Sequence, residues 1–169
     1  MLGNIRDGLF SMDIEIRHCT PADIPAIVRL MRDFAEFENL GNFFEVTEER
    51  LHAAMFGDKG FVEGLIAAEG ERAFGYALFY PYFASFRGQT GFYLEDIYIH
   101  EDYRRHGVGQ AMVRSIAALA AERGYERMDF MVLDWNTPAS NFYVKLGAVR
   151  DDDERHFKFI DDAFRQLSS

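Results

Sequence analysis

The stretch from residue 92 to residue 123 limits most strongly what this chain can fold into. It reads FYLEDIYIHEDYRRHGVGQAMVRSIAALAAER. Aromatic and β-branched residues fill Phe92 to His100, which is typical of a strand, and only the acidic pair Glu95–Asp96 interrupts them. From Val108 onward the apolar residues recur at helical spacing until Gly124, which predicts a helix.

The turn between this strand and this helix has the chemistry of an anion site. The first amides of a helix lack intrahelical partners, and the helix dipole adds positive charge there. Gly107 and Gly109 allow the backbone to approach a ligand closely, while Arg104 and Arg105 supply fixed charge. We therefore predict that the turn binds a phosphate or a diphosphate. The alternative is an ordinary turn with solvated arginines.

A dinucleotide is the other ligand that a glycine turn of this kind would accept. The dinucleotide pattern needs a third small residue, and that position, counted from Gly107, is Met112. The chain also shows no second strand–helix–strand unit at the expected spacing. Dinucleotide binding therefore stays a minor alternative.

Length and composition indicate one globular domain. The chain has 169 residues, of which 49% are hydrophobic and 15% aromatic. We expect residues 1–11 to form a flexible leader, with Met12 as a second possible start, and residues 12–169 to form the domain. The single Cys19 excludes an intrachain disulfide and favours a cytoplasmic setting. No apolar run is long enough to cross a bilayer, so we expect no membrane partner.

The charge balance bears on the partners. A net charge of −10 argues against nucleic-acid binding, which needs a basic surface. The acidic residues fit either a solvated surface or a cleft that attracts a cationic substrate, and charge alone favours the former. The five histidines are scattered singly, so we expect no metal site.

Elsewhere the sequence alternates between strand and helix patterns. Thr20 and Thr47 have the positions of helix caps, and Gly147 has that of a helix end. Further strands are expected at residues 14–18, 61–69, 72–82 and 128–133, with helices from residues 20, 47 and 138 and a loop between Pro81 and Gly88. Two last strands should flank residues 151–154. This order predicts a mixed α/β (α+β) sheet with helices on both faces.

Two motifs resemble a known family. Arg104-x-x-Gly107-x-Gly109, after a strand and at the start of a helix, is similar to the coenzyme A loop of the GCN5-related N-acetyltransferases (GNAT). Tyr93-Leu-Glu-Asp96 and the segment from Trp135 to Tyr143 resemble the diamine (spermidine/spermine) and thialysine branch of that family. The resemblance implies the GNAT fold, a mixed and mostly antiparallel sheet, with acetyl-CoA as acetyl donor and a homodimer joined through the C-terminal strands.

The resemblance also implies roles for individual residues. Glu95 corresponds to the general base, and Tyr143 to the acid that protonates the leaving thiolate. From the residues alone, Glu95 fits a half-buried ion pair equally well, and Tyr143 fits core packing better. The cofactor contacts implied are Ile97, Tyr98, Ile99, Arg104, Arg105, His106, Gly107, Val108, Gly109, Gln110, Asn136, Asn141 and Tyr143.

For the amine, the implied contacts are Glu38, Phe86, Glu95 and Asp96. Because neighbouring strand residues face opposite ways, only Glu95 or Asp96 should enter a given cleft. Ala84 replaces an acidic residue of the polyamine enzymes, which leaves room for a shorter amine. The expected function is transfer of acetyl to a small primary amine in a ternary complex. A protein-lysine acetyltransferase and a non-catalytic acyl-CoA-binding module are the alternatives.

Overall fold

The structure is a computed structural model, and it describes residues 4–5 and 14–168. The strands are β1 (Asn4–Ile5), β2 (Ile14–His18), β3 (Glu63–Glu69), β4 (Arg72–Ala84), β5 (Gln89–Ile99) and β6 (Arg127–Asp129). The helices are α1 (Ile24–Phe37), α2 (Glu48–Phe56), α3 (Val108–Glu122), α4 (Thr137–Lys145) and α5 (Asp161–Leu167). The chain divides into two compact units, and the boundary in the sequence falls between Met131 and Val132.

The first unit contains one sheet with the strand order β1-β2-β3-β4-β5-β6. Every neighbouring pair is antiparallel except β5 and β6, which are parallel to each other and are connected by α3. A parallel pair needs a crossover, and the predicted helix after the glycine turn provides it. The predicted mixed, mostly antiparallel sheet is confirmed.

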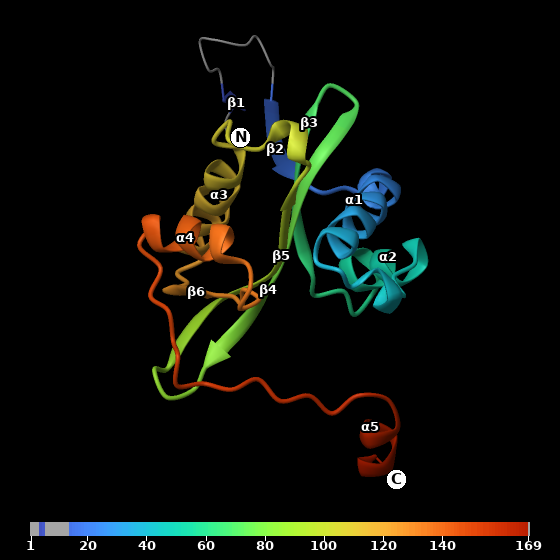
Figure 1. Cartoon of the computed structure of the whole chain (residues 1–169), viewed down its shortest axis with the longest axis vertical. Helices are drawn as coiled ribbons and strands as arrows, with labels where there is room; N and C mark the ends of the chain where they lie inside the picture. Colours follow the sequence, from blue (N-terminus) through green and yellow to red (C-terminus); the bar gives the residue numbers. More distant parts are fainter. Residues whose placement is uncertain (1–3, 6–13, 169) are drawn as a thin grey trace. The chain divides into compact units, whose positions relative to one another are not determined.

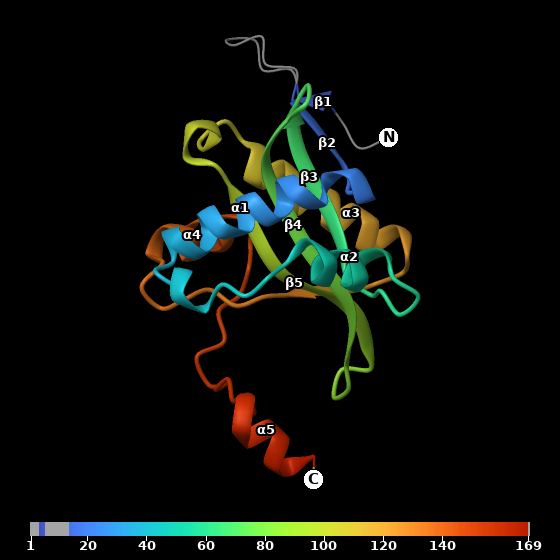
Figure 2. The same cartoon turned by 90° about the vertical axis from the view of Figure 1, so that its right-hand side faces the viewer.

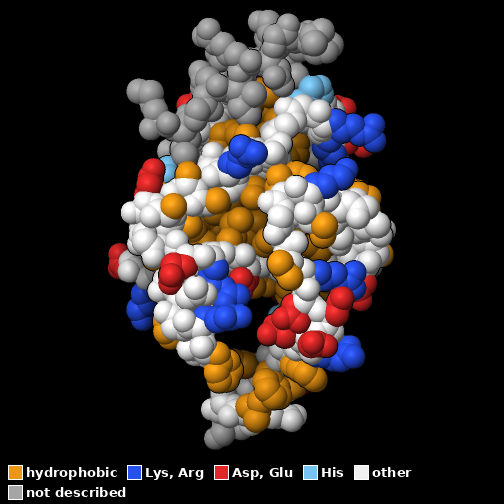
Figure 3. All heavy atoms as spheres, turned by 90° about the vertical axis from the view of Figure 1, so that its left-hand side faces the viewer, with side chains coloured by type: hydrophobic (Ala, Val, Ile, Leu, Met, Phe, Trp, Pro, Cys, Tyr) orange, Lys and Arg blue, Asp and Glu red, His pale blue; other side chains and the backbone are white. Residues whose placement is uncertain are grey.

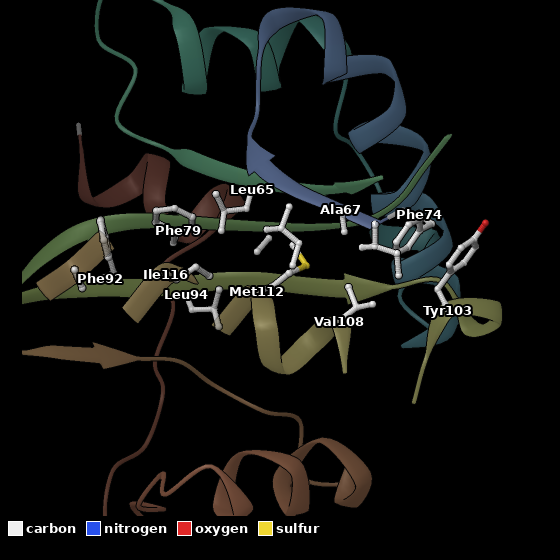
Figure 4. Packing of buried hydrophobic residues seen from close by; sticks show 14 residues of the cluster. Leu65, Ala67, Phe74, Phe79, Phe92, Leu94, Tyr103, Val108, Met112 and Ile116 are labelled. Carbon is white, nitrogen blue, oxygen red and sulfur yellow. The ribbon is translucent and has the colours of Figure 1, made fainter. Parts of the chain in front are cut away.

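Helices cover both faces of this sheet, as Figures 1 and 2 show, with α1 and α2 on one face and α3 on the other. On the α3 side, Val108, Met112 and Ile116 pack against buried residues of the central strands (Figure 4). On the other side, Ile27 of α1 and Leu51 of α2 pack against Ile66, Tyr76, Leu78 and Tyr98. Side chains of a strand alternate between its two faces, so both faces of this sheet carry apolar residues. Each of the three helices presents a stripe of apolar residues at helical spacing and covers one of these faces.

The hairpins differ from the predicted ones in one place. The β3–β4 turn falls where it was predicted, with Gly70 at φ 58°. The predicted loop after Pro81 is wrong, because β4 continues through Pro81 to Ala84 and pairs with β5 as far as Gln89. Proline interrupts a strand only where its missing N–H was needed, and Pro81 pairs with Phe92 without ending the strand. The turn between β4 and β5 is therefore confined to residues 85–88.

A bulge lies in the middle of β5. Leu78 of β4 is opposite Asp96, and the next residue, Phe79, is opposite Leu94, so Glu95 is an extra residue without a partner across the pair. Before the bulge, the even-numbered Phe92 and Leu94 pack in the core on the α3 side. After it, the odd-numbered Ile97 and Ile99 pack there, and the even-numbered Tyr98 packs in the core on the other side. The inserted residue thus reverses which alternate positions of β5 face α3.

The second unit starts at Val132 and contains α4 and α5. The predicted helix α4 is confirmed, and Asn136 caps it, since its Oδ1 accepts a hydrogen bond from the Ala139 N–H at 3.2 Å. Gly147 follows with φ 99°, as expected after a helix end.

Two sequence predictions near the C-terminus are wrong. Residues 148–160 carry no strand, and α5 follows them. The apolar residues that suggested these strands are all exposed, namely Val149, Phe157, Phe159 and Ile160. In the described residues, no sheet edge pairs with this segment. The strand predicted at residues 128–133 is also shorter, because β6 pairs with β5 only at Arg127 to Asp129.

The predicted boundary near residue 12 falls where little is described. Asn4–Ile5 pair with β2 as the edge strand β1. The remaining residues of the expected leader lie outside the described residues. The boundary between a leader and a domain from residue 12 therefore stays a prediction.

Candidate active site

The glycine turn has the geometry that an anion site requires. Gly107 adopts φ 77°, a left-handed conformation, and stands directly before the first residue of α3. Val108 is buried and fixes the start of the helix in the core, whereas Gly107 and Arg105 are exposed. The amides at the start of α3 therefore point out of an anchored helix end.

Arg104 lies differently from what its sequence position suggests. Its Nε donates to the carbonyl oxygen of Ile99 at 2.8 Å. Its guanidinium carbon lies 4.8 Å from the centre of the Phe37 ring and 5.4 Å from that of Tyr98. These contacts join the end of α1 to the strand that leads into the turn. Arg104 therefore stabilises the packing of these two elements, a structural role that its positive charge did not suggest.

Two places beside the turn carry polar groups that coenzyme A could pair with. Nδ1 of His106 is buried and has no hydrogen-bond partner in the described part of the chain, so a ligand oxygen could pair with it. The second place is the open side of β5. His100 N donates to Phe74 O at 2.8 Å, so ladder alternation directs the peptide groups of Ile97 and Ile99 away from β4.

No strand of the described residues pairs with that side, since β6 reaches only Gly91 to Tyr93. Peptide groups at Ile97 and Ile99 can therefore accept an extended chain with amide groups, such as the pantetheine arm. The carbonyl of Ile99 already accepts from Arg104, which leaves its second lone pair for such a ligand. The residues present fit coenzyme A.

A cleft of about 520 Å³ lies on the face of β5 that α1 and α2 cover, on the other side of the sheet from α3. It is lined by Met31, Leu51, Phe61, Val62, Leu78, Tyr80, Glu95 and Asp96. Both carboxylates therefore enter the same cleft, and the prediction that only one of them would do so is wrong. The bulge at Glu95 is the reason, because it places two successive side chains on one face.

Asp96 is the more buried of the two acids. Burial, together with the negative charge of Glu95, raises its pKa to about 6, although the Tyr76 hydroxyl donates to its Oδ2 at 3.2 Å. Glu38, at the end of α1, adds to this effect, and burial raises the pKa of Glu38 itself. Three acids therefore influence one small region, and a cation there would be strongly favoured.

Glu95 is exposed to solvent in the cleft and has a partner in Tyr80. The Tyr80 hydroxyl donates to its Oε2 at 3.4 Å. Tyr80 is held by stacking on Tyr93, with ring centres 5.3 Å apart, and by an edge contact with Phe61 at 5.7 Å. Burial and the charge of Glu95 raise the pKa of Tyr80 to about 12, so its hydroxyl remains a donor.

The remaining predicted residues lie elsewhere. Phe86 is fully exposed in the turn between β4 and β5 and is not among the residues that line the cleft. In the second unit, Asn136 caps α4, Asn141 is exposed, and Tyr143 is buried. Burial raises the pKa of Tyr143 to about 12, and its ring lies 5.0 Å from that of Phe142.

Two tyrosines of the cleft region were missed in the sequence. Tyr76 and Tyr80 alternate with Leu78 on β4 and hydrogen-bond to the two acids of β5. Their spacing of four residues places them on one face, and β4 was predicted to form a hairpin with its neighbour. Pairing the predicted strands β4 and β5 across their turn would have suggested these contacts.

Two negative findings concern the described residues. None of their helices has the length and apolar character needed to span a membrane. They also contain no group of three or more His, Cys, Asp or Glu side chains arranged to hold a metal ion.

Comparison with known proteins identifies the class of protein to which this sheet and glycine turn belong. The model of the acetyltransferase (GNAT) family matches residues 25–148. The chain belongs to the GNAT acetyltransferase family.

Individual relatives narrow the branch. The thialysine N-epsilon-acetyltransferase of Bos taurus is 33% identical over 92% of this chain and 97% of its own length. A spermidine/spermine N(1)-acetyltransferase-like protein of Homo sapiens is 33% identical over 82% of this chain and 21% of its own length. Among solved structures, an integron cassette protein from V. cholerae has a TM-score of 0.76 at 19% identity, covering 93% of this chain and 98% of its own. The predicted family and fold are confirmed.

Proposed function

We propose that this chain transfers the acetyl group of acetyl-CoA to the primary amine of a small molecule in a ternary complex. One observation carries the proposal: Glu95 and Asp96 enter one cleft on the strand whose far end leads into the glycine turn. The family membership and the small-amine names of the relatives support it. The amine would lie in the cleft, within reach of Glu95.

The amine first has to lose a proton. An alkylamine has a pKa of about 10.4, so at neutral pH it is almost entirely ammonium. Glu95, directly or through a water molecule, accepts that proton, and Asp96 with Glu38 holds the positive charge until then. Proton transfer of this kind contributes roughly 10² to 10⁴ in rate.

Acetyl-CoA supplies an activated thioester, so that a C–N bond forms as the C–S bond breaks. The second proton that the amine loses balances the proton that the departing sulfur takes up. Amides from Arg105 to Gln110 would hold the diphosphate at the start of α3, with His106 beside them. The peptide groups of Ile97 and Ile99 would hold the pantetheine arm along the open side of β5. The predicted backbone contact from Tyr98 is wrong, because its peptide groups face Tyr76 of β4. We include the backbone of Val108 and Gly109 and the side chains of Asn136 and Asn141 among these contacts.

Tyr143 would donate a proton to the departing sulfur. Its raised pKa keeps the hydroxyl protonated throughout the neutral range, as a donor must be. Tyr143→Phe should therefore lower kcat, while the affinity for acetyl-CoA, measured by calorimetry, stays within about twofold. Undiminished turnover would remove Tyr143 from the mechanism.

The proposal extends to assembly and setting. Exposed apolar residues gather in the C-terminal segment (Figure 3), among them Phe157, Phe159, Ile160, Phe164 and Leu167. We propose that this segment is the homodimer contact, because a second copy would cover these side chains. We also propose that the protein works in the cytoplasm, because the single Cys19 excludes an intrachain disulfide.

An acetylation assay tests the function directly. Purified protein is given acetyl-CoA and, in turn, polyamines, thialysine, free lysine, a simple alkylamine and a lysine-containing peptide, and released thiol is measured. Acetylation of the small amines is expected. A chain that binds acetyl-CoA in calorimetry but acetylates nothing would be a binding module, and selective acetylation of the peptide would indicate a protein acetyltransferase.

A further inference from the structure

The amine cleft combines two kinds of surface. Its floor comes from the sheet and contains Leu78, Tyr80, Glu95 and Asp96. Its walls come from α1, α2 and the segment before β3, which contribute Met31, Leu51, Phe61 and Val62. Every wall residue is apolar, so the charge that faces a ligand is concentrated at one place on the floor.

The walls are fixed by the core behind them. Leu51 is buried, and Met31 and Val62 pack against the same cluster as Leu51. Phe61, the one exposed wall residue, contacts the ring of Tyr80, which in turn donates to Glu95. An apolar wall of this kind is built into the fold and is not a loose surface contact.

We infer, resting on the proposed function, that the preferred acceptor is an amine with one ammonium group on an uncharged alkyl or aryl stem. The ammonium meets Glu95 and Asp96, and the stem fills the space between the four wall residues. A cleft of about 520 Å³ has the size of an ordinary small-molecule site.

A second ammonium group fits this cleft poorly. A diamine or polyamine that placed its first amine at Glu95 would have to direct the next charge against Leu51, Phe61 or Val62. Burying a charge against apolar groups without a partner is strongly unfavourable. Each methylene of an uncharged stem, by contrast, gains roughly fourfold in affinity as it leaves water.

The test compares amines of equal length that differ in a single group. Hexylamine and 1,5-diaminopentane have the same number of heavy atoms, and both carry an ammonium with a pKa near ~10.4. We expect kcat/KM to be about tenfold higher or more for hexylamine, and to rise from propylamine to hexylamine by roughly threefold to fourfold per methylene. 2-Phenylethylamine should also be accepted.

A variant then moves the preference. Phe61→Asp adds a carboxylate to the wall at an exposed position, so it should favour the diamine by about tenfold relative to hexylamine. Phe43→Asp is the matched control, since Phe43 is also exposed and does not line the cleft. That control should leave the ratio unchanged.

The outcomes separate the two proposals. A diamine preferred over hexylamine by the unaltered chain, or a flat alkylamine series, would overturn the inference while leaving the acetyltransferase function in place. A chain that acetylates none of these amines, nor any other, would contradict the proposed function and this inference together.

Discussion

The glycine turn and the acidic cleft both depend on β5, yet they are built in different ways. The turn presents backbone amides at the start of α3, and its shape depends on a left-handed glycine and a buried anchor, Val108. The cleft presents side chains, and their direction depends on one extra residue in a strand. A backbone site is thus specified by local residue order, whereas a side-chain site depends on how two strands are aligned.

The largest test of this contrast is Glu95→Gln, which alters a side chain of the cleft and leaves the turn intact. We expect kcat to fall by roughly 10² to 10⁴, because the proposed general base is lost. The residual rate should rise with pH toward the pKa of the amine, about 10.4, since only free amine would react. Calorimetry should show unchanged affinity for acetyl-CoA.

Glu122→Gln is a matched control, because Glu122 is exposed at the end of α3 and away from the cleft residues. It should behave as the unaltered chain. A pH profile of Glu95→Gln identical to that of the unaltered chain would remove Glu95 from the role of base.

Asp96→Asn tests how much the buried negative charge of Asp96 lowers the stability of the folded chain. The folded-state pKa of Asp96, about 6, lies above its ordinary value of 3.8, so the folded chain binds this proton more tightly than the unfolded chain. That contribution to stability is complete below about pH 4 and is lost as the pH rises through about 6. Asparagine carries no charge at any pH and can still accept from Tyr76.

At about pH 7.5 we therefore expect Asp96→Asn to raise the free energy of unfolding by on the order of 2 kcal/mol. At about pH 4 the two chains should have nearly equal stability. Urea unfolding at both pH values measures this. Equal stability at the higher pH would mean that the ionised Asp96 is better solvated than its contacts indicate.

Arg104→Lys tests a residue that links the two regions. Lysine keeps the charge but loses the Nε contact to Ile99 and the planar packing on Phe37 and Tyr98. We expect KM to rise about tenfold for both acetyl-CoA and the amine, because Phe37 immediately precedes Glu38. Arg114→Lys, at an exposed position of α3, is the control and should change neither value. A rise for acetyl-CoA alone would show that Arg104 acts only at the turn.

Gly107→Ala is the smallest change and tests the backbone site alone. A Cβ here would meet no atom within 4 Å, so only the strain of φ 77° acts against it. We expect a loss of roughly 1 kcal/mol in stability and weaker acetyl-CoA binding. Gly70→Ala has the same open surroundings at φ 58° and should lose similar stability with no change in binding. Equal binding in both variants would place the diphosphate elsewhere.

These differences explain which parts could be predicted from the sequence. The turn was recognisable because strand, arginines, glycines and helix follow one another without a gap. The shared cleft of Glu95 and Asp96 was not, because regular alternation places neighbours on opposite faces and no residue type marks the bulge. The partners Tyr76 and Tyr80 depend on the same alignment.

The C-terminal segment illustrates the opposite error. Phe157 and Phe159 alternate with the polar His156 and Lys158 as in a strand, yet a strand forms only where an edge receives it. Such an edge is supplied by another part of a fold, or by another molecule, and short-range residue order does not contain it.

The bulge at Glu95 also limits how the length of β5 can vary. Removing Glu95 alone would restore regular pleating and leave Ile97 and Ile99 facing α3, so the fold could tolerate it although the cleft would lose one acid. The loss of both Glu95 and Asp96 would instead turn Ile97 and Ile99 away from α3 and bring Tyr98 beneath that helix. Gene variants of this protein that lose two residues at the bulge should therefore be rarer, among those that still fold, than variants that lose one.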